Sequence, residues 1–92
     1  MATVNCQTGA QSGTINSGGS FDWTNTSTTG TCEVTGVSGW CTQSSYTVPK
    51  ATGPNSPGTT SATTLNVTGN YTFSSVCLNP NAPVPRIHIG SK

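Results

Sequence analysis

The sequence predicts an all-β protein, a small Greek-key β-sandwich of about seven or eight short strands that is stapled by disulfides. Three observations predict this fold class. No segment shows the apolar period of roughly 3.6 residues that marks an amphipathic helix. Short alternating stretches recur between Gly, Pro and Asn residues, which is typical of strands and turns. Four cysteines, an even number, are typical of a small disulfide-braced domain. The length predicts a single domain over residues 1–92.

The composition is that of a nearly uncharged chain rich in small polar residues. Thr, Ser, Gly and Asn supply 49 of the 92 residues, charged residues supply 5%, and the net charge is +1. Average soluble proteins have about 25% charged residues. Disordered chains combine low hydrophobicity with high net charge. Because the net charge here is small, and β-branched and aromatic residues are spread along the chain, we expect a folded domain.

Short segments with a strand pattern run through the whole chain. In order, they span residues 3–7, 12–17, 20–25, 31–34, 40–42, 46–48, 63–68, 71–78 and 86–89. The most regular segment is 20–25, where Phe21 and Trp23 share one face. Asp22 and Thr24 fall on the other face, which is the two-residue period of a strand with one buried side.

The middle of the chain predicts a hairpin and a long loop. Residues 31–34 and 40–42 read as short strands around residues 35–39, a candidate hairpin. The segment 50–61 contains two Gly and two Pro residues and is expected to be the longest loop. A loop of this length in a compact domain is often functional or mobile.

The segment 63–68 should bury Leu65 and Val67, and Gly69-Asn70 resembles a tight hairpin turn. In the segment 71–78, Tyr71 and Phe73 share one face.

Val76 and Leu78 have the opposite parity to Tyr71 and Phe73. A bulge at Ser74-Ser75 would return both side chains to the core. In the last segment, Ile87 and Ile89 should point inward.

The four cysteines are expected to form two disulfides. Cys6, Cys32, Cys41 and Cys77 lie 26, 9 and 36 residues apart, without the close ligand pairs of a structural zinc site. Zinc and free thiols are the alternatives. Spacing alone leaves all three connectivities open. The preferred set is Cys32–Cys41, which would brace the candidate hairpin, with Cys6–Cys77, which would tie the chain ends together.

Three stretches together resemble the cupredoxin family of blue-copper proteins. They are residues 17–25, a glycine turn followed by a strand that ends Trp-Thr-Asn; residues 65–73 followed by Cys77, a Gly-x-Tyr-x-aromatic strand that leads to a cysteine; and residues 87–89, an alternating closing strand. The resemblance implies a β-sandwich of the cupredoxin type. An immunoglobulin-like sandwich, in which Trp23 or Trp40 could pack on a disulfide, is the main structural rival.

The copper ligands of this family are not preserved. Blue-copper sites use two imidazoles, a thiolate and usually an axial Met. By the resemblance, Cys32 stands where the family has its first His, and Cys77 matches the thiolate. Pro80 and Pro83 stand at the second His and the axial Met. The resemblance therefore implies a copper-free relative, in which a Cys32–Cys77 bridge (paired with Cys6–Cys41) would lie where a cupredoxin holds its metal.

The inventory of reactive side chains predicts no enzyme. Asp22 and Glu33 are the only carboxylates and His88 is the only imidazole. Catalysis usually draws on such groups at matched positions. No Gly-x-Ser-x-Gly elbow supports a Ser-His-Asp triad. We expect no catalytic residue, no metal and no cofactor.

Four side chains remain as candidate contacts with a ligand or partner. Trp40 either packs against a disulfide or forms an exposed sugar-stacking platform with Tyr46. Arg86 and His88 are expected to share one exposed strand face as a small cationic patch. Strand edges without Lys or Glu could add a strand from a partner or a second copy.

These observations predict a non-enzymatic structural or interaction module that is secreted or displayed at the cell surface. Its partners would be neighbouring domains, other surface proteins or further copies of itself. The alternative is a carbohydrate-binding module, which has a similar low-charge composition.

Two other partners are excluded. Three Lys and Arg residues cannot neutralise the roughly 6–10 phosphates of a nucleic-acid site. No apolar run approaches the roughly 20 residues of a membrane span. The opening residues do not form a signal peptide, so for a secreted protein we expect that a leader has been removed.

Overall fold

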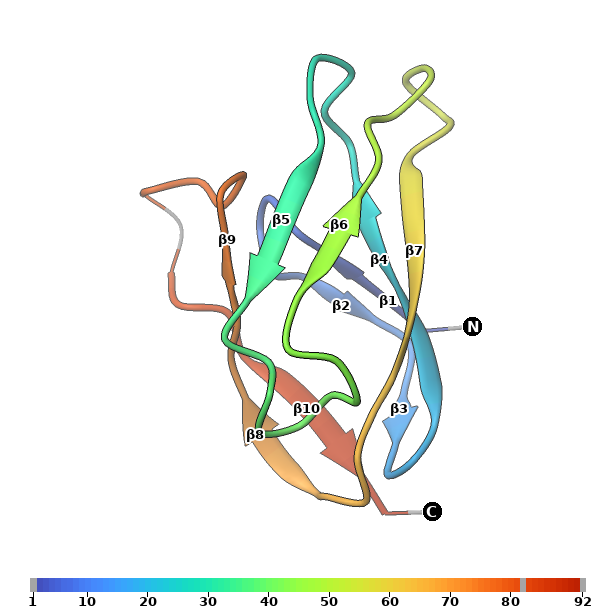
Figure 1. Ribbon diagram of the computed structural model, residues 1–92, viewed down its shortest axis with the longest axis vertical. Helices are drawn as coiled ribbons and strands as arrows, with labels where there is room; N and C mark the ends of the chain where they lie inside the picture. Colours follow the sequence, from blue (N-terminus) through green and yellow to red (C-terminus); the bar gives the residue numbers. More distant parts are fainter. Residues whose placement is uncertain (1, 82, 92) are drawn as a thin grey trace.

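The computed structural model describes residues 2–81 and 83–91, which fold into short β-strands joined by turns and loops (Figure 1). The strands are β1 (Thr3–Asn5), β2 (Gln11–Ser12), β3 (Ile15–Asn16), β4 (Ser20–Asn25), β5 (Cys32–Thr35), β6 (Tyr46–Val48), β7 (Gly58–Thr63), β8 (Gly69–Tyr71), β9 (Ser74–Ser75) and β10 (Ile87–Gly90). The all-β prediction is confirmed. Among the described residues there is no helix long and apolar enough to cross a membrane.

The strands form three small sheets. One has the order β2-β1-β4-β7, the second β3-β10-β8 and the third β6-β5-β9. Only two residues separate β8 from β9, so one run of chain links the second sheet to the third. Two pairs are parallel, β1 with β4 and β3 with β10, and the remaining strand pairs are antiparallel.

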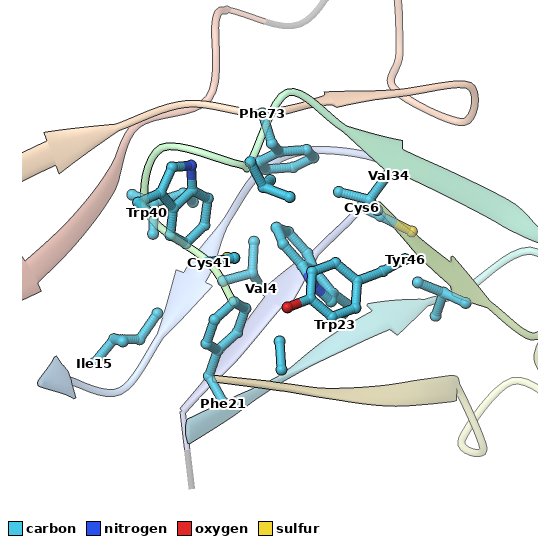
Figure 2. Close-up of a cluster of buried hydrophobic side chains, with 14 of the residues drawn as sticks. Val4, Cys6, Ile15, Phe21, Trp23, Val34, Trp40, Cys41, Tyr46 and Phe73 are labelled. Atoms are coloured by element: carbon cyan, nitrogen blue, oxygen red, sulfur yellow. The ribbon is translucent and has the colours of Figure 1, made fainter. Parts of the chain in front are cut away.

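All three sheets contribute their buried faces to one hydrophobic core. Trp23 of β4 lies among the other core aromatics in Figure 2. Its ring centroid is 4.8 Å from that of Phe73 and 5.1 Å from that of Phe21. Ile87 and Ile89 enter from β10 and are fully buried. Edge-to-face aromatic pairs at such distances add to the area that they bury. The burial of these side chains confirms the two-residue alternation that the sequence predicted for β4 and β10.

The predicted hairpin over residues 31–42 is wrong. β5 pairs with β6 on one side and with β9 on the other. Residues 40–42 contribute only an isolated bridge, from Cys41 to Thr64. The backbone amides of Trp40 and Cys41 both donate to the Val37 carbonyl, so the chain turns tightly here and directs the Trp40 ring into the core.

The predicted 50–61 loop is shorter than expected, because β7 begins at Gly58. A Cβ on Gly58 would lie 1.8 Å from the Pro49 carbonyl oxygen, so only glycine allows this close approach. From Gly58 onward, β7 pairs with β4 along its whole length. The Gly and Pro residues predicted a loop through a region in which β7 begins.

The segment that follows β7 also differs from the prediction. β7 ends at Thr63, and Leu65 is 37% exposed where an inward side chain was predicted. Gly69 and Asn70 belong to β8 and do not form a hairpin turn. β8 pairs with β10, which is distant in sequence. This long-range pairing overrides the local turn signal.

The bulge expected at Ser74-Ser75 does not return Val76 to the core, since Val76 is 75% exposed. β9 consists of these two serines alone, and Cys77, which follows, is bonded to Cys32. Phe73 is buried as predicted. The disulfide, and not a continued strand, determines the path of the chain after β9.

Candidate functional site

One disulfide joins Cys32, the first residue of β5, to Cys77, with a Cα–Cα distance of 5.5 Å. The pairing of Val34 with Ser75 places the two cysteines near each other. The preferred pairs, Cys32–Cys41 and Cys6–Cys77, are therefore wrong. The hairpin that Cys32–Cys41 was expected to brace does not form, so its two cysteines are not brought together.

Cys6 and Cys41 are free thiols in the structure, so the chain has one disulfide where two were expected. Both side chains are buried. Desolvation by burial raises the pKa of Cys6 to about 11 and that of Cys41 to about 12. Because the thiolate is the reactive form, neither thiol is suited to nucleophilic chemistry at neutral pH.

A fully buried polar side chain, Asn25 at the end of β4, lies close to the disulfide. Its Nδ2 donates to the carbonyl oxygens of Gly30, Val48 and Pro49, at 3.0, 3.3 and 3.1 Å. The Gly30 carbonyl lies in the loop before β5, the Val48 carbonyl at the end of β6, and the Pro49 carbonyl directly after it. Asn25 therefore links the end of β4 to the loop before β5 and to the end of β6. Its position in an alternating strand did not predict this role.

Gln7 connects this asparagine to the disulfide. Its Nε2 donates to Asn25 Oδ1 and lies 3.6 Å from Cys32 Sγ. Its Oε1 accepts hydrogen bonds from the backbone amide and the hydroxyl of Thr26, both at 3.2 Å. The neutral amide of Gln7 thus lies beside the disulfide and is hydrogen-bonded to that of Asn25. We call Gln7, Asn25, Cys32 and Cys77 the disulfide end of the domain.

The two carboxylates and the imidazole that were considered for catalysis lie on three different strands and do not form one site. Asp22 on β4 accepts a hydrogen bond from Ser61, and Glu33 on β5 accepts one from Thr47. His88 lies on β10, with Nδ1 3.3 Å from Asn70 Oδ1. In the part of the chain that is described, no three His, Cys, Asp or Glu side chains group as metal ligands.

Of the two alternatives for Trp40, the exposed sugar platform with Tyr46 is wrong. The two side chains are 2% and 4% exposed. Trp40 stacks on Phe21 and Tyr71, and its Nε1 donates to the Thr72 carbonyl at 3.0 Å. Figure 2 shows both rings within the core cluster. The core takes up these aromatics because few other large apolar side chains are available to fill it.

Arg86 and His88 are exposed, as predicted. The Gln11 side chain forms two hydrogen bonds with the backbone of His88. Its Oε1 accepts from the His88 amide at 2.8 Å, and its Nε2 donates to the His88 carbonyl at 3.0 Å. β3 pairs with the next two residues of β10. On this edge of β10 the Gln11 carboxamide therefore occupies the backbone groups just before β3 begins to pair.

The longest edge strand is partly covered. β7 lies at the edge of the four-stranded sheet, but Thr60 Oγ1 donates to the Thr47 carbonyl of β6 at 2.9 Å. β2, β3 and β9 are edge strands of two residues each. Short or covered edges resist the addition of another strand. The predicted strand-edge contacts therefore receive little support.

The surface carries an open groove of about 520 Å³. It lies where the turn after β5, strand β8 and the segment leading into β10 meet. The residues that characterise it are Gly36, Gly39, Trp40, Asn70, Tyr71 and Arg86. Sequence reasoning marked only Trp40 and Arg86 as candidate contacts. It missed the groove because three segments that are distant in sequence form it.

A second hollow, of about 420 Å³, adjoins this groove and shares Thr72, Val84 and Pro85 with it. Leu78 and Pro83 also line it. Val84 lines both hollows and is 79% exposed, so each of them includes an exposed apolar side chain.

Comparison with known proteins finds no matching family model, no matching curated protein and no matching solved structure.

Proposed function

We propose that this domain is a copper-free relative of the cupredoxins, a Greek-key sandwich that acts as a non-enzymatic structural or interaction module of a secreted or cell-surface protein. One observation carries the proposal. The disulfide joins Cys32 to Cys77, the positions at which the resemblance places the first imidazole and the thiolate of the copper site. A covalent bond between two chain segments thus takes the place of a metal that would hold them together.

The donor set at this end does not fit copper. A blue-copper site needs imidazoles and a thiolate. Here both sulfurs are bonded to each other, and the neighbouring side chains are the amides of Gln7 and Asn25. The single imidazole, His88, pairs with Asn70 on the sheet formed by β3, β10 and β8. No step of electron transfer through copper is therefore assigned to this domain.

The strand pairing favours the cupredoxin-like alternative over the immunoglobulin-like one. Immunoglobulin sandwiches are built from two antiparallel sheets. In this chain β1 runs parallel to β4, and β3 runs parallel to β10. The link between β8 and β9 also allows the second and third sheets to act as one layer opposite the four-stranded sheet.

A role without catalysis is supported by the placement of the reactive groups. The two carboxylates lie on different strands and each accepts a hydrogen bond from a hydroxyl. The two thiols are buried and have raised pKa values. General acid–base chemistry needs such groups within reach of one substrate atom. A disulfide is typical of proteins that fold in an oxidising compartment, which supports secretion.

Visible spectroscopy tests this proposal. Cu(II) is added to the native, oxidised protein, and the visible absorption spectrum is followed for the intense band that is typical of a blue-copper site. An amicyanin-type cupredoxin is the positive control. We expect no intense blue band. A stoichiometric intense band would overturn the copper-free assignment.

Carbohydrate binding is the second candidate, and the groove beside Tyr71 favours it. The ring of Tyr71 is half-buried at the surface, so it offers an aromatic contact where the buried Trp40 and Tyr46 do not.

Self-association through strand edges is a weaker candidate, because the edges are short or covered. Sedimentation velocity at increasing protein concentration tests self-association directly.

A further inference from the structure

We propose that the groove binds a carboxylate-bearing sugar ring, such as a uronate residue of an acidic polysaccharide. Arg86 would hold the carboxylate and Tyr71 would contact the ring. This inference rests on the proposed interaction module and names a ligand class for it. It uses a site that lies apart from the disulfide end of the domain, so the two proposals can fail separately.

The charge of the groove favours an anion. Arg86 is the only charged residue among those that line it. Asp22 and Glu33, the two carboxylates of the chain, lie on β4 and β5, where Ser61 and Thr47 donate to them. The guanidinium group can therefore bind a carboxylate from a ligand. Its planar fork matches a carboxylate through two parallel hydrogen bonds.

The aromatic contact is already positioned. The Tyr71 ring stacks on Trp40 with a centroid distance of 6.0 Å and an angle of 22° between the planes. Its hydroxyl donates to the Thr68 carbonyl at 2.8 Å. Packing and this hydrogen bond fix the orientation of the ring before a ligand arrives. A ligand that stacks on its accessible surface would lose little side-chain entropy from the protein.

The rest of the groove suits a polar ring. Asn70 is exposed, and its Nδ2 provides donors for hydroxyl groups, while its Oδ1 lies 3.3 Å from His88 Nδ1. Gly36 and Gly39 bring backbone without side chains to the opposite side, and a Cβ on Gly39 would meet no atom within 4 Å. The volume of about 520 Å³ falls within the roughly 300–1,000 Å³ of small-molecule sites.

A sugar is favoured over a peptide carboxylate as the occupant. A bound peptide usually adds a strand to a free sheet edge and gains affinity from its main chain. β8, the edge strand at the groove, has only three residues. The Thr72 carbonyl that follows it already accepts from Trp40 Nε1. Little unpaired backbone therefore remains for a peptide to use.

The test is an NMR titration of the ¹⁵N-labelled, oxidised protein with trigalacturonate. The fully methyl-esterified trimer is the matched neutral ligand. We expect saturable shifts confined to amides of Gly36, Gly39, Asn70, Tyr71 and Arg86. The ester should bind at least ~10-fold more weakly, because a charge-assisted pair is lost.

Two variants with matched controls separate the charge from the shape of the groove. Arg86→Gln should weaken binding at least ~10-fold, whereas Lys50→Gln removes an exposed cation outside the groove and should leave binding unchanged. Gly39→Phe should block the groove. Gly30→Phe is its control, because a Cβ on Gly30 also meets no atom within 4 Å and Gly30 does not line the groove.

Equal binding of the acid and its ester, or no shifts with either at millimolar concentration, would overturn the inference. Binding of an acetylated tripeptide through its C-terminal carboxylate, in the absence of trigalacturonate binding, would also overturn it and make a peptide the occupant. If no blue-copper band appears and no ligand binds in the groove, only the proposed ligand class is refuted. A blue-copper band would instead refute the proposed function and leave the groove result to stand.

Discussion

Cys32 and Cys77 are bonded to each other across 45 positions of sequence, so the first residue of β5 is fixed to the segment after β9. The bond closes the end of the domain where Gln7 and Asn25 form their hydrogen bonds. In a chain with few large apolar side chains, such a link supplies stability that the core alone provides sparingly. The first prediction concerns this link.

Removal of the disulfide should lower the free energy of unfolding by about 4 kcal/mol, because the reduced chain regains the entropy of a loop of this length. The measurement is urea unfolding of the oxidised wild type and of the Cys32→Ser/Cys77→Ser variant. Reductant should destabilise the wild type by a similar amount. The double variant should be insensitive to reductant, and a wild type that ignores reductant would count against the bond.

The two free thiols should be inaccessible in the native state. Cys6 and Cys41 are buried, and their pKa values are about 11 and about 12. Iodoacetamide at neutral pH should therefore leave native protein unlabelled, whereas protein in concentrated urea should gain two labels by mass. Rapid labelling of the folded protein would contradict the burial of these side chains.

Alkaline pH should destabilise the fold. In the unfolded chain these thiols ionise near the ordinary pKa of 9.0, whereas in the folded chain the values are about 11 and about 12. A raised acid pKa means that folding favours the protonated form, so the stabilisation is complete below pH 9.0 and declines as the pH rises toward 11–12. Burial also raises the pKa of Tyr46, which acts in the same direction.

Urea midpoints measured between neutral and strongly alkaline pH test this dependence. The Cys6→Ala/Cys41→Ala variant is the comparison, since it should lose part of the alkaline decline while keeping the remainder from Tyr46. Identical slopes for the variant and the wild type would show that the thiols do not contribute.

Asn25 should be essential for stability despite its polarity. Asn25→Ala removes a fully buried amide and the hydrogen bonds that it donates to the Gly30, Val48 and Pro49 carbonyls, so we expect a loss of about 3 kcal/mol. Asn66 is exposed, and Asn66→Ala should change the stability by less than about 0.5 kcal/mol. Equal, small effects of the two substitutions in urea unfolding would remove the structural role assigned to Asn25.

Gly58 should not tolerate a side chain. Its Cβ would lie 1.8 Å from the Pro49 carbonyl oxygen, so Gly58→Ala forces backbone to move at the start of β7 and should cost about 2 kcal/mol or more. Gly39→Ala is the control, because its Cβ meets open space. Thermal unfolding of the two variants distinguishes them. A Gly58→Ala protein as stable as Gly39→Ala would contradict the path of the chain here.

The sequence was informative where local alternation and burial agree. Phe21 and Trp23 alternate with polar residues, and the strand they predict has the same bounds as β4. Ile87 and Ile89 identified β10 in the same way. In both cases the pattern of large apolar side chains is sufficient, because the side chains that fill the core determine which face is buried.

Local patterns were misleading where distant pairing decides the structure. Gly69-Asn70 has the composition of a turn, but β8 forms there because β10 pairs with it. For Trp40 the sequence left packing and an exposed platform open, and the structure shows it buried because the core needs its volume. The groove combines Gly39, Tyr71 and Arg86 from three separate segments, so no local signal could have predicted it.

Disulfide mapping decides whether Cys32 is bonded to Cys77, on which the proposed copper-free site depends. Free thiols are alkylated in denaturant, and the protein is then digested with chymotrypsin without reduction. Cleavage after Trp23, Trp40 and Tyr46 places the four cysteines in separate peptides. We predict one crosslinked species, which contains Cys32 and Cys77, with Cys6 and Cys41 alkylated. A crosslink from Cys77 to Cys6, or from Cys32 to Cys41, would contradict the account.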